Sequence, residues 1–309
     1  MEYRQLGRSG LQVSEIGLGT NNFGRRLDAE ATAVVIDQAL DTGINMIDTA
    51  NSYGGGLSEE YIGRALKGKR QQALIATKVA SRAADGPNQS GASRQHILTE
   101  VENSLQALGT DYIDLYQVHF PDSNTPIEET LHTLDSLVQS GKVRYIGCSN
   151  FMAWQVCEAH WTSKSQGLTP FVSAQPRYSM LHRDAEAELV PFCQAYGVGI
   201  LPYFPLENGF LTGKYRRGET APDGTRLAQN DRGMFTDAHF DLLETLESFS
   251  SEHGHTVLEL AFAWLLANSA VSSVIAGATK PEQVVANAES AGWRLSDEEL
   301  AEVDSLLGK

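Results

Sequence analysis

Four polar side chains in the first half of the sequence close or follow short apolar segments. Asp48 ends INMID, Tyr53 follows it in a glycine-rich turn, Lys78 ends ALIATK and His119 ends YIDLYQVH. A tyrosine with the ordinary pKa of about 10 is a poor acid at neutral pH unless its anion is stabilised. A lysine cation nearby would lower that pKa, and a carboxylate would hold the lysine charged and in place. These residue types could therefore deliver a proton if the fold brings them together.

The chemistry that suits this set is the reduction of a carbonyl group. His119 could donate a hydrogen bond to a carbonyl oxygen and orient the substrate, while Tyr53 gives that oxygen a proton. Reduction also needs a hydride, which no side chain supplies and a nicotinamide cofactor does. The residues therefore predict an oxidoreductase that uses such a cofactor.

Each of the four residues has a simpler explanation when it is taken alone. An aspartate at a strand end is commonly a turn or cap residue, a tyrosine a rim aromatic, a lysine solvated and a histidine a satisfied core residue. Perturbed groups also arise in structural networks, so only the joint occurrence at successive strand ends favours an active site. Asp114 lies in the middle of its strand, where packing is the simpler role. The remaining histidines have no third ligand in sight, and we predict no metal site.

The segments that must position these residues repeat along the whole chain. Predicted strands cover residues 15–20, 44–49, 73–78, 112–119, 143–149, 171–175, 198–203 and 272–277. Amphipathic helical patterns lie between them, for example over residues 29–43, 93–109 and 126–141. Strand–helix alternation predicts parallel βαβ units, and eight repeats favour an α/β fold of the (β/α)8 TIM barrel type. We expect one domain over residues 1–309, opened by a β-hairpin that plugs the barrel from below.

One connection is too long for this repeat. Residues 208–235 separate PYFPL from the next helical pattern, and a long irregular segment inside a compact domain is usually functional. The segment carries Lys214, Arg216, Arg217 and Arg226, a concentration of positive charge in an acidic protein. In a barrel it would follow strand seven, where phosphate sites are commonly built.

The composition narrows the kinds of partner. The formal net charge is −15 and the pI about 4.9, which opposes non-specific binding to nucleic acid or to an anionic membrane. No apolar run approaches the length of a membrane span, and the polar N-terminus lacks an apolar targeting core. Three cysteines in a large chain fit reduced thiols, so we expect a cytoplasmic protein. The expected partner is a small-molecule carbonyl substrate, and a homo-oligomer is compatible with the sequence.

Nearly the whole sequence resembles the aldo-keto reductase family. The similarity rests on MIDTANSYG, ATKV, DLYQVHFPD, GKVRYIGCSNF, PYFPLENGFLTGKY and IAGATKPEQVVANAE, whose order and spacing fit together. Within the family, the LTGKY and GATKPEQ segments resemble bacterial reductases and potassium-channel β-subunits more than aldose reductase. The resemblance implies a (β/α)8 barrel that binds NADP(H) in extended form, without a Rossmann domain, and reduces an aldehyde or ketone to an alcohol.

The resemblance also implies roles for individual residues. The catalytic tetrad would be Asp48, Tyr53, Lys78 and His119, with Tyr53 as the general acid. The nicotinamide end of the cofactor would be held by Gly19, Thr20, Asp48, Ser149, Asn150, Gln175 and Tyr203. The phosphates would be clasped by Phe204, Pro205, Leu206, Gly209, Lys214 and Arg226. The adenosine end would be held by Gly277, Thr279, Lys280, Gln283 and Asn287.

The sequence departs from the family pattern at several positions. Phe204 replaces a serine, Phe120 stands where arginine is frequent, and Pro176 and Ser179 alter the stretch after Gln175. Relatives of aldose reductase bind the 2′-phosphate of the cofactor with a Lys/Arg pair. The matching positions here are Gly277 and Gln283, and the residues that could substitute are Lys280, Lys214 and Arg226. Because these cations could bind the 2′-phosphate, NADPH is favoured as the cofactor, and NADH stays open as the alternative.

Two other functions compete with a reductase. The first is a regulatory subunit that binds NADP(H) with little turnover, like the channel β-subunits. His119 argues against it, because those subunits carry a different residue there. The second is a Schiff-base lyase with Lys78 as the nucleophile, which leaves Tyr53 and the basic segment unexplained.

Overall fold

Eight parallel strands follow one another around a barrel in the computed structural model, which describes residues 1–228 and 230–308. They are β3 (Ile16–Gly19), β4 (Met46–Asp48), β5 (Leu74–Val79), β6 (Ile113–Val118), β7 (Val143–Ser149), β8 (Ser173–Gln175), β9 (Gly199–Ile200) and β10 (Val274–Gly277). The order in the sheet is β10-β3-β4-β5-β6-β7-β8-β9. All eight predicted strands are confirmed, each within the range expected or one residue beyond it.

The sheet closes on itself between its two edges. Isolated parallel bridges join Ile200 to Val271 and Tyr203 to Ile275. The amide of Ile275 also donates to the carbonyl of Pro202 at 2.9 Å. The predicted (β/α)8 barrel is therefore confirmed.

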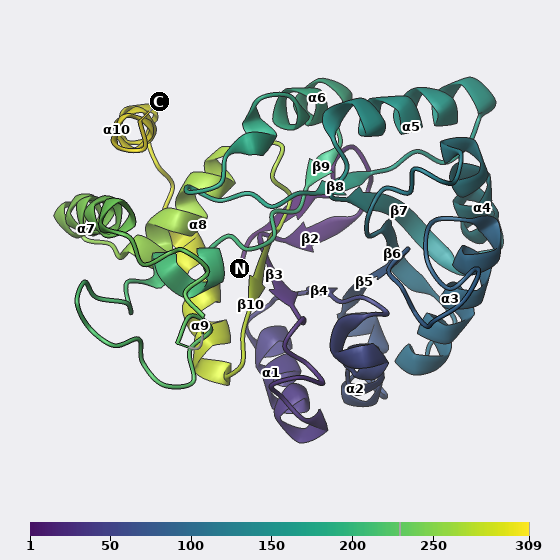
Figure 1. Cartoon of the computed structure of the whole chain (residues 1–309), viewed down its shortest axis with the longest axis horizontal. Coiled ribbons are helices and arrows are strands. Elements are labelled where there is room, and N and C mark those ends of the chain that lie inside the picture. The colour runs from purple at the N-terminus through teal and green to yellow at the C-terminus, as the bar shows by residue number, and fades with distance from the viewer. Residues whose placement is uncertain (229, 309) are drawn as a thin grey trace.

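Helices cover the outside of the strands all the way round (Figure 1). They are α1 (Ala29–Asp41), α2 (Leu57–Ala65), α3 (Arg94–Leu108), α4 (Ile127–Gln139), α5 (Ala153–Gln166), α6 (Leu189–Tyr196), α7 (Asp237–Glu252), α8 (Val257–Ala267), α9 (Pro281–Glu289) and α10 (Asp297–Leu306). Local sequence sets their ends. The Ser93 hydroxyl caps α3 by accepting from the amide of His96, and Gly109 ends that helix at φ 61°, where glycine is strain-free.

The N-terminal hairpin plugs the end of the barrel where the strands begin. Its strands β1 (Tyr3–Gln5) and β2 (Gln12–Ser14) are antiparallel. The hairpin backbone forms hydrogen bonds with residues that lie just before the barrel strands. The amide of Ser14 donates to the side chain of Asn45 at 2.8 Å, and the amide of Arg8, in the turn, donates to the carbonyl of Gly197 at 2.9 Å. The apolar cluster inside the barrel is Leu6, Val13, Met46, Ala76, Leu115, Leu201 and Ile275. With this end filled, the opposite end is the only open mouth of the barrel in the described chain.

A larger apolar core lies between the strands and the helices, and Asp114 belongs to that outer side. Its carboxylate pairs with Arg70 at 2.6 Å and accepts the amide of Ile75 at 2.9 Å. The expected packing role is therefore confirmed, and Asp114 faces away from the mouth.

The long connection after β9 begins with a short 3-10 helix, Glu207–Thr212, and then runs irregularly to α7. It passes beside the loop that follows β3, because the Arg26 guanidinium donates to the carbonyl of Gly224. In Figure 1 this connection is the wide green loop beside α9. It therefore spans the open end of the barrel at the junction of β3 and β10.

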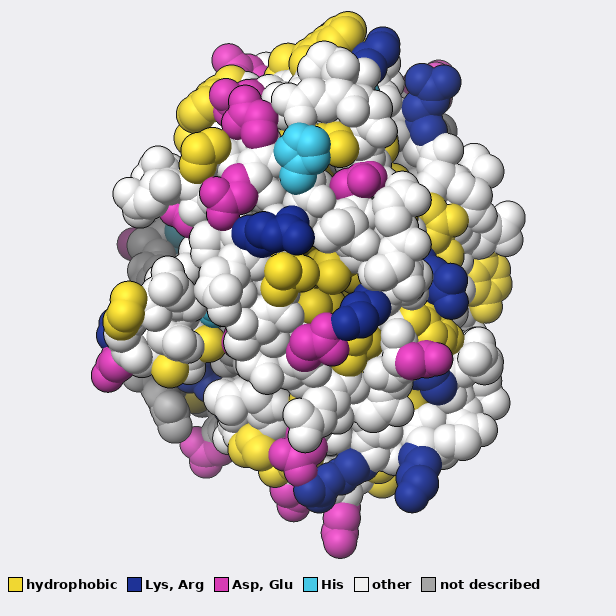
Figure 2. Space-filling model, turned by 90° about the vertical axis from the view of Figure 1, so that its right-hand side faces the viewer, with side chains coloured by type: hydrophobic (Ala, Val, Ile, Leu, Met, Phe, Trp, Pro, Cys, Tyr) yellow, Lys and Arg dark blue, Asp and Glu magenta, His cyan; other side chains and the backbone are white. Residues whose placement is uncertain are grey.

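The outer surface carries charges of both signs. On the face drawn in Figure 2, which includes α3 and α4, Lys and Arg alternate with Asp and Glu and neither sign forms a continuous patch. Among the described residues, no helix is both long enough and apolar enough to cross a bilayer.

Candidate active site

Asp48, Lys78 and Tyr53 form one hydrogen-bonded array at the open end of the barrel. The Lys78 ammonium, fully buried at 0% exposure, lies 2.7 Å from Asp48 Oδ1 and 2.9 Å from the Thr49 carbonyl. Its third contact is the Tyr53 hydroxyl at 3.5 Å. The strand ends therefore bring together the three residues that the sequence placed on β4, β5 and the turn after β4.

The glycines after Tyr53 are what let this turn bring the phenol back over the strands. Gly54, Gly55 and Gly56 have φ angles of 60°, 69° and 96°, in the left-handed region that side chains rarely adopt. A Cβ on Gly54 would lie 2.5 Å from the carbonyl oxygen of Phe23. Any other residue at this position would therefore push the turn, and Tyr53 with it, away from Lys78.

Burial decides the protonation state of the array. It raises the pKa of Tyr53, and the Lys78 cation lowers that pKa without cancelling the effect. Burial is also the largest influence on Lys78 and lowers its pKa, but Asp48 and Tyr53 together outweigh burial and raise the lysine pKa. The sequence predicted that the lysine would lower the pKa of the phenol. Lys78 does lower it, but burial has the larger effect and the pKa is raised. At neutral pH the site therefore holds a neutral phenol beside a charged ammonium.

His119 faces Tyr53 across the mouth, with ring centroids 5.9 Å apart. Burial, assisted by the charge of Lys78, lowers its pKa to about 3, so the imidazole is neutral at physiological pH. Nδ1 lies 3.0 Å from the Ser81 hydroxyl, and Phe120 stacks on the ring at 4.6 Å. The side chain is thus fixed in orientation and does not compete with Tyr53 as a charged acid.

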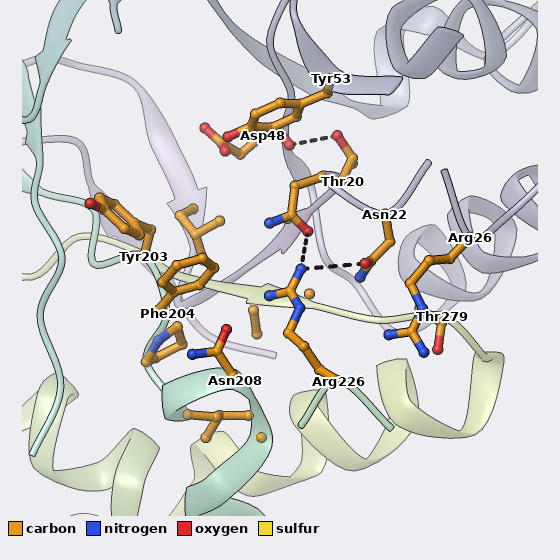
Figure 3. A pocket seen from close by; sticks show the side chains of 18 of the residues that line it. Thr20, Asn22, Arg26, Asp48, Tyr53, Tyr203, Phe204, Asn208, Arg226 and Thr279 are labelled. Atoms are coloured by element: carbon orange, nitrogen blue, oxygen red, sulfur yellow. Dashed lines mark hydrogen bonds between the residues drawn. The ribbon is translucent and has the colours of Figure 1, made fainter. Parts of the chain in front are cut away.

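A cavity of about 1110 Å³ opens in front of this array. Every residue that the family resemblance assigns to the cofactor lines it, and so do Asp48, Tyr53 and His119. Lys78 does not, because it lies behind Tyr53. Figure 3 shows Tyr53 and Asp48 at one end of the cavity and Arg26 and Thr279 at the other.

The amide side chains near the tetrad form hydrogen bonds with tetrad residues and with Tyr203. Asn150 donates to the carbonyl of His119 at 2.9 Å and accepts from the Tyr203 hydroxyl at 2.8 Å. Gln175 donates to Asp48 Oδ2 at 2.8 Å. These bonds position Asn150, Gln175 and Tyr203 at the rim of the array, where the resemblance places the nicotinamide.

Two of the four basic residues in the long connection reach the cavity, and two do not. Lys214 and Arg226 line it, while Arg216 pairs with Glu247 and Arg217 with acidic residues of α7 on the outer surface. The two that line the cavity are the two that the family resemblance assigns to the phosphates. Arg216 and Arg217, to which the resemblance assigned no role in cofactor binding, pair with acidic residues of α7 instead.

The cavity-facing pair is held among other cations. Burial and then Arg26 and Arg226 lower the pKa of Lys214, while burial, Arg232 and Arg26 lower that of Arg226. Cations that repel one another in a cavity are stabilised when an anion binds between them, so such a cluster is a candidate anion site. The Arg226 guanidinium extends toward Asn22 in Figure 3 and donates to it at 3.4 Å. It also donates to Asn21 at 3.0 Å.

The backbone around this pair also suits a phosphate-bearing ligand. Phe204, Glu207 and Asn208 have φ angles of 54°, 43° and 58°, and such strained positions cluster at ligand sites. The buried Oδ1 of Asn208 has no hydrogen-bond partner among the residues that the structure describes. A Cβ on Gly209 would lie 2.7 Å from the Lys214 ammonium, so any other residue at this position would displace the ammonium. The residues present therefore fit the diphosphate of a nicotinamide dinucleotide.

Sequence reasoning missed several residues that line the cavity. Asn21, Asn22 and Arg26 follow β3 directly, and Asn208 lies between two residues assigned to the cofactor. A signal was available for the first three, since residues after a barrel strand face the mouth.

The fold and the site together are those of a barrel oxidoreductase. Residues 15–307 match the model of the Aldo/keto reductase family, and the chain belongs to that family.

Relatives with different names share the whole barrel. The chain is 36% identical over 317 residues to aldo-keto reductase YhdN of Bacillus subtilis (99% of this chain, 94% of that protein). It is 34% identical over 323 residues to L-glyceraldehyde 3-phosphate reductase of Escherichia coli K12 (99% and 92%). It is also 35% identical over 296 residues to a probable voltage-gated potassium channel subunit beta of Oryza sativa (93% and 90%). Family and relatives support a reductase, and nicotinamide cofactors are typical of the family.

Proposed function

We propose that this protein reduces an aldehyde or ketone to an alcohol with NADPH, using Tyr53 as the general acid. The observation that carries the proposal is the neutral phenol of Tyr53 held 3.5 Å from the buried, Asp48-paired ammonium of Lys78. A phenol with a fixed cation beside it can release a proton and have its anion stabilised at once. The substrate is a small-molecule carbonyl compound.

The reaction divides between the cofactor and the chain. A bound nicotinamide supplies the hydride that the carbonyl carbon gains. Tyr53 transfers its hydroxyl proton to the carbonyl oxygen, and Lys78 stabilises the phenolate that remains. His119 donates a hydrogen bond to the same oxygen and orients it. One hydride and one proton are consumed for each alcohol formed.

The preference for NADPH rests on the charge at the far end of the cavity. Lys214, Arg226, Arg26 and Lys280 line that half, which gives more positive charge than a diphosphate alone requires. Cations placed this way favour the dinucleotide with the additional phosphate. The amide of Thr279 donates to Gln283 Oε1 at 2.8 Å, so Gln283 is held in a fixed position beside Lys280.

A spectrophotometric screen tests the proposal. NADPH oxidation is followed across aldehydes, ketones, sugars and phosphorylated trioses, with NADH in parallel. We expect turnover with at least one carbonyl class and a lower KM for NADPH than for NADH. No oxidation of either cofactor with any class would contradict the proposed function.

A second candidate comes from the relatives named as channel subunits. On that alternative the chain binds NADP(H) as a regulatory subunit and turns over little. Rapid oxidation of bound NADPH by carbonyl compounds would exclude it, whereas tight cofactor binding without oxidation would favour it. His119 supports the reductase, because its neutral ring is in place to orient a carbonyl group.

A further inference from the structure

The hydroxyl of Ser81 faces the ring nitrogen of His119 that lies away from the reaction. Ser81 Oγ is 3.0 Å from Nδ1. Among the described residues this is the one hydrogen bond recorded for the Ser81 hydroxyl, and Nδ1 has no other partner. The opposite nitrogen, Nε2, has no protein partner there, and His119 lines the cavity. Nε2 is therefore the nitrogen available to a carbonyl oxygen.

A neutral imidazole carries one proton, so its two nitrogens cannot both donate. If Nδ1 holds the proton, it donates to Ser81, and Nε2 presents a lone pair that repels a carbonyl oxygen. If Ser81 donates its O–H proton to Nδ1, the ring proton is on Nε2 and can be donated to the substrate. The hydrogen bond at one nitrogen thus decides what the other can do.

The chain around Ser81 is built to hold the hydroxyl in place. Ala80, directly before it, has φ 85°, a left-handed angle that is unfavourable for a residue with a side chain. The carbonyl of Ala80 accepts from the amide of Gly91 at 3.1 Å, and the carbonyl of Ser81 lies 3.3 Å from Nε2 of His96. Hydrogen bonds therefore hold the turn after β5 at the strained residue and at the residue that follows it.

The histidine is held as firmly as the serine. The amide of His119 donates to the carbonyl of Val79 at 2.8 Å, and the carbonyl of His119 accepts from Asn150 at 2.9 Å. Phe120 stacks on the ring with only 16° between the planes. These contacts fix the backbone of both residues and the plane of the imidazole, and they place Oγ of Ser81 within hydrogen-bond distance of Nδ1.

We infer that Ser81 is a positioning residue for the reduction, and that its hydroxyl donates to Nδ1 and keeps the His119 proton on Nε2, facing the substrate. The inference deepens the proposed function and rests on it. Nothing is transferred between Ser81 and the substrate. Ser81 acts by fixing which nitrogen of the imidazole is the donor.

The test combines kinetics with a direct observation of the tautomer. In Ser81→Ala we expect kcat to fall about tenfold, the value of one hydrogen bond, with the Kd of NADPH unchanged. Ser81→Thr keeps the hydroxyl and should restore most of the rate. Arg82→Ala is the matched control, because Arg82 is the next residue, is exposed and, within the described part of the chain, donates its side-chain hydrogen bonds to Ala84 and Asp85. In a His119→Gln background, Ser81→Ala should cause no further loss.

Nitrogen-15 NMR of histidine-labelled protein reads the tautomer without any turnover. The wild type should show His119 protonated on Nε2, and Ser81→Ala should shift protonation toward Nδ1. The inference is overturned if Ser81→Ala keeps both the wild-type kcat and the Nε2 tautomer, or if Ala and Thr lower kcat equally with the tautomer unchanged. A wild type that reduces no carbonyl compound would contradict the proposed function, and the NMR comparison would then decide the role of Ser81 alone.

Discussion

The ammonium of Lys78 and the carboxylate of Asp48 form an ion pair of 2.7 Å with both side chains removed from water. Asp48 exposes only 3% of its side chain and also accepts from Gln175. A buried pair of this kind contributes little net stability, but the loss of one partner leaves an uncompensated charge. The pair therefore ties the fold to the array that holds Tyr53.

Removal of both partners should destabilise the protein by less than the sum of the two separate removals. We expect Lys78→Met to lower the free energy of unfolding by about 3 kcal/mol, because Asp48 stays buried and unpaired. The double variant Lys78→Met/Asp48→Asn should lose less than the sum of the two single losses, by more than about 1 kcal/mol. Denaturant titration checks this, with Arg64→Met of the exposed Arg64–Glu60 pair as control. Strictly additive losses would contradict the coupling.

The cations of the long connection after β9 that line the cavity and those that face outward should differ in their effect on cofactor binding. Arg226→Ala removes a cation that lines the cavity, and we expect the Kd of NADPH to rise about tenfold or more. The matched control, Arg217→Ala, removes a cation of the same connection that pairs with Asp241 and Glu244 outside the cavity. Isothermal titration calorimetry measures both. An equal rise in Kd for the two variants would show that the outward placement of Arg217 is wrong.

The pH profile of reduction should lack the usual histidine step. His119 has a pKa of about 3, so it stays neutral from pH 5 upward and no break is expected near 6.5. Burial raises the pKa of Tyr53, so its proton is lost, and the rate falls, only as the pH rises past the ordinary tyrosine range. Measurement of kcat/KM between pH 5 and 10 should therefore show neither a break near 6.5 nor a fall at its alkaline end. A break near 6.5 that disappears in His119→Gln would contradict the account.

Stability should decrease with pH because of a buried acid behind the site. Glu59 is 2% exposed, and its hydrogen-bond donor is Thr77. Burial raises the pKa of Glu59 from 4.5 to about 7, so the folded state holds the proton more tightly than the unfolded chain across that window. The stabilisation is complete below 4.5 and is lost as the pH rises through 7, a change of about 3 kcal/mol.

Replacement by the neutral amide should remove that dependence. Glu59→Gln is expected to raise the free energy of unfolding at pH 8 by about 2 kcal/mol and to change it little at pH 5. Glu60→Gln, on the neighbouring half-exposed residue, serves as the control and should leave the pH dependence unchanged. Denaturation of the three proteins at both pH values gives the answer; a parallel pH dependence for wild type and Glu59→Gln would refute it.

Strand positions and strand-end chemistry could be predicted because both follow from short-range rules. The apolar runs before Asp48, Lys78 and His119 each fit one strand, and parallel strands in a barrel end at the same mouth. That geometry alone brings together residues far apart in the chain. It needs no knowledge of how any side chain turns.

What could not be predicted depends on burial and on the path of irregular backbone. The pKa of Tyr53 rises because the site is deeper than the sequence shows. Arg217 turns outward because α7 presents acids to it, and Asn22 turns inward because the loop after β3 folds back beside Arg226. Ser81 carried no sequence signal, since its position depends on the left-handed turn at Ala80.

The central claim is that Tyr53 gives the proton, and a single-turnover measurement on Tyr53→Phe tests it most directly. Phenylalanine keeps the ring and removes only the hydroxyl that lies 3.5 Å from Lys78. We predict that the rate of hydride transfer from bound NADPH falls by about 10² to 10⁴ while the Kd of NADPH stays within about threefold of wild type. Hydride transfer at the wild-type rate in Tyr53→Phe, with cofactor binding intact, would contradict the account.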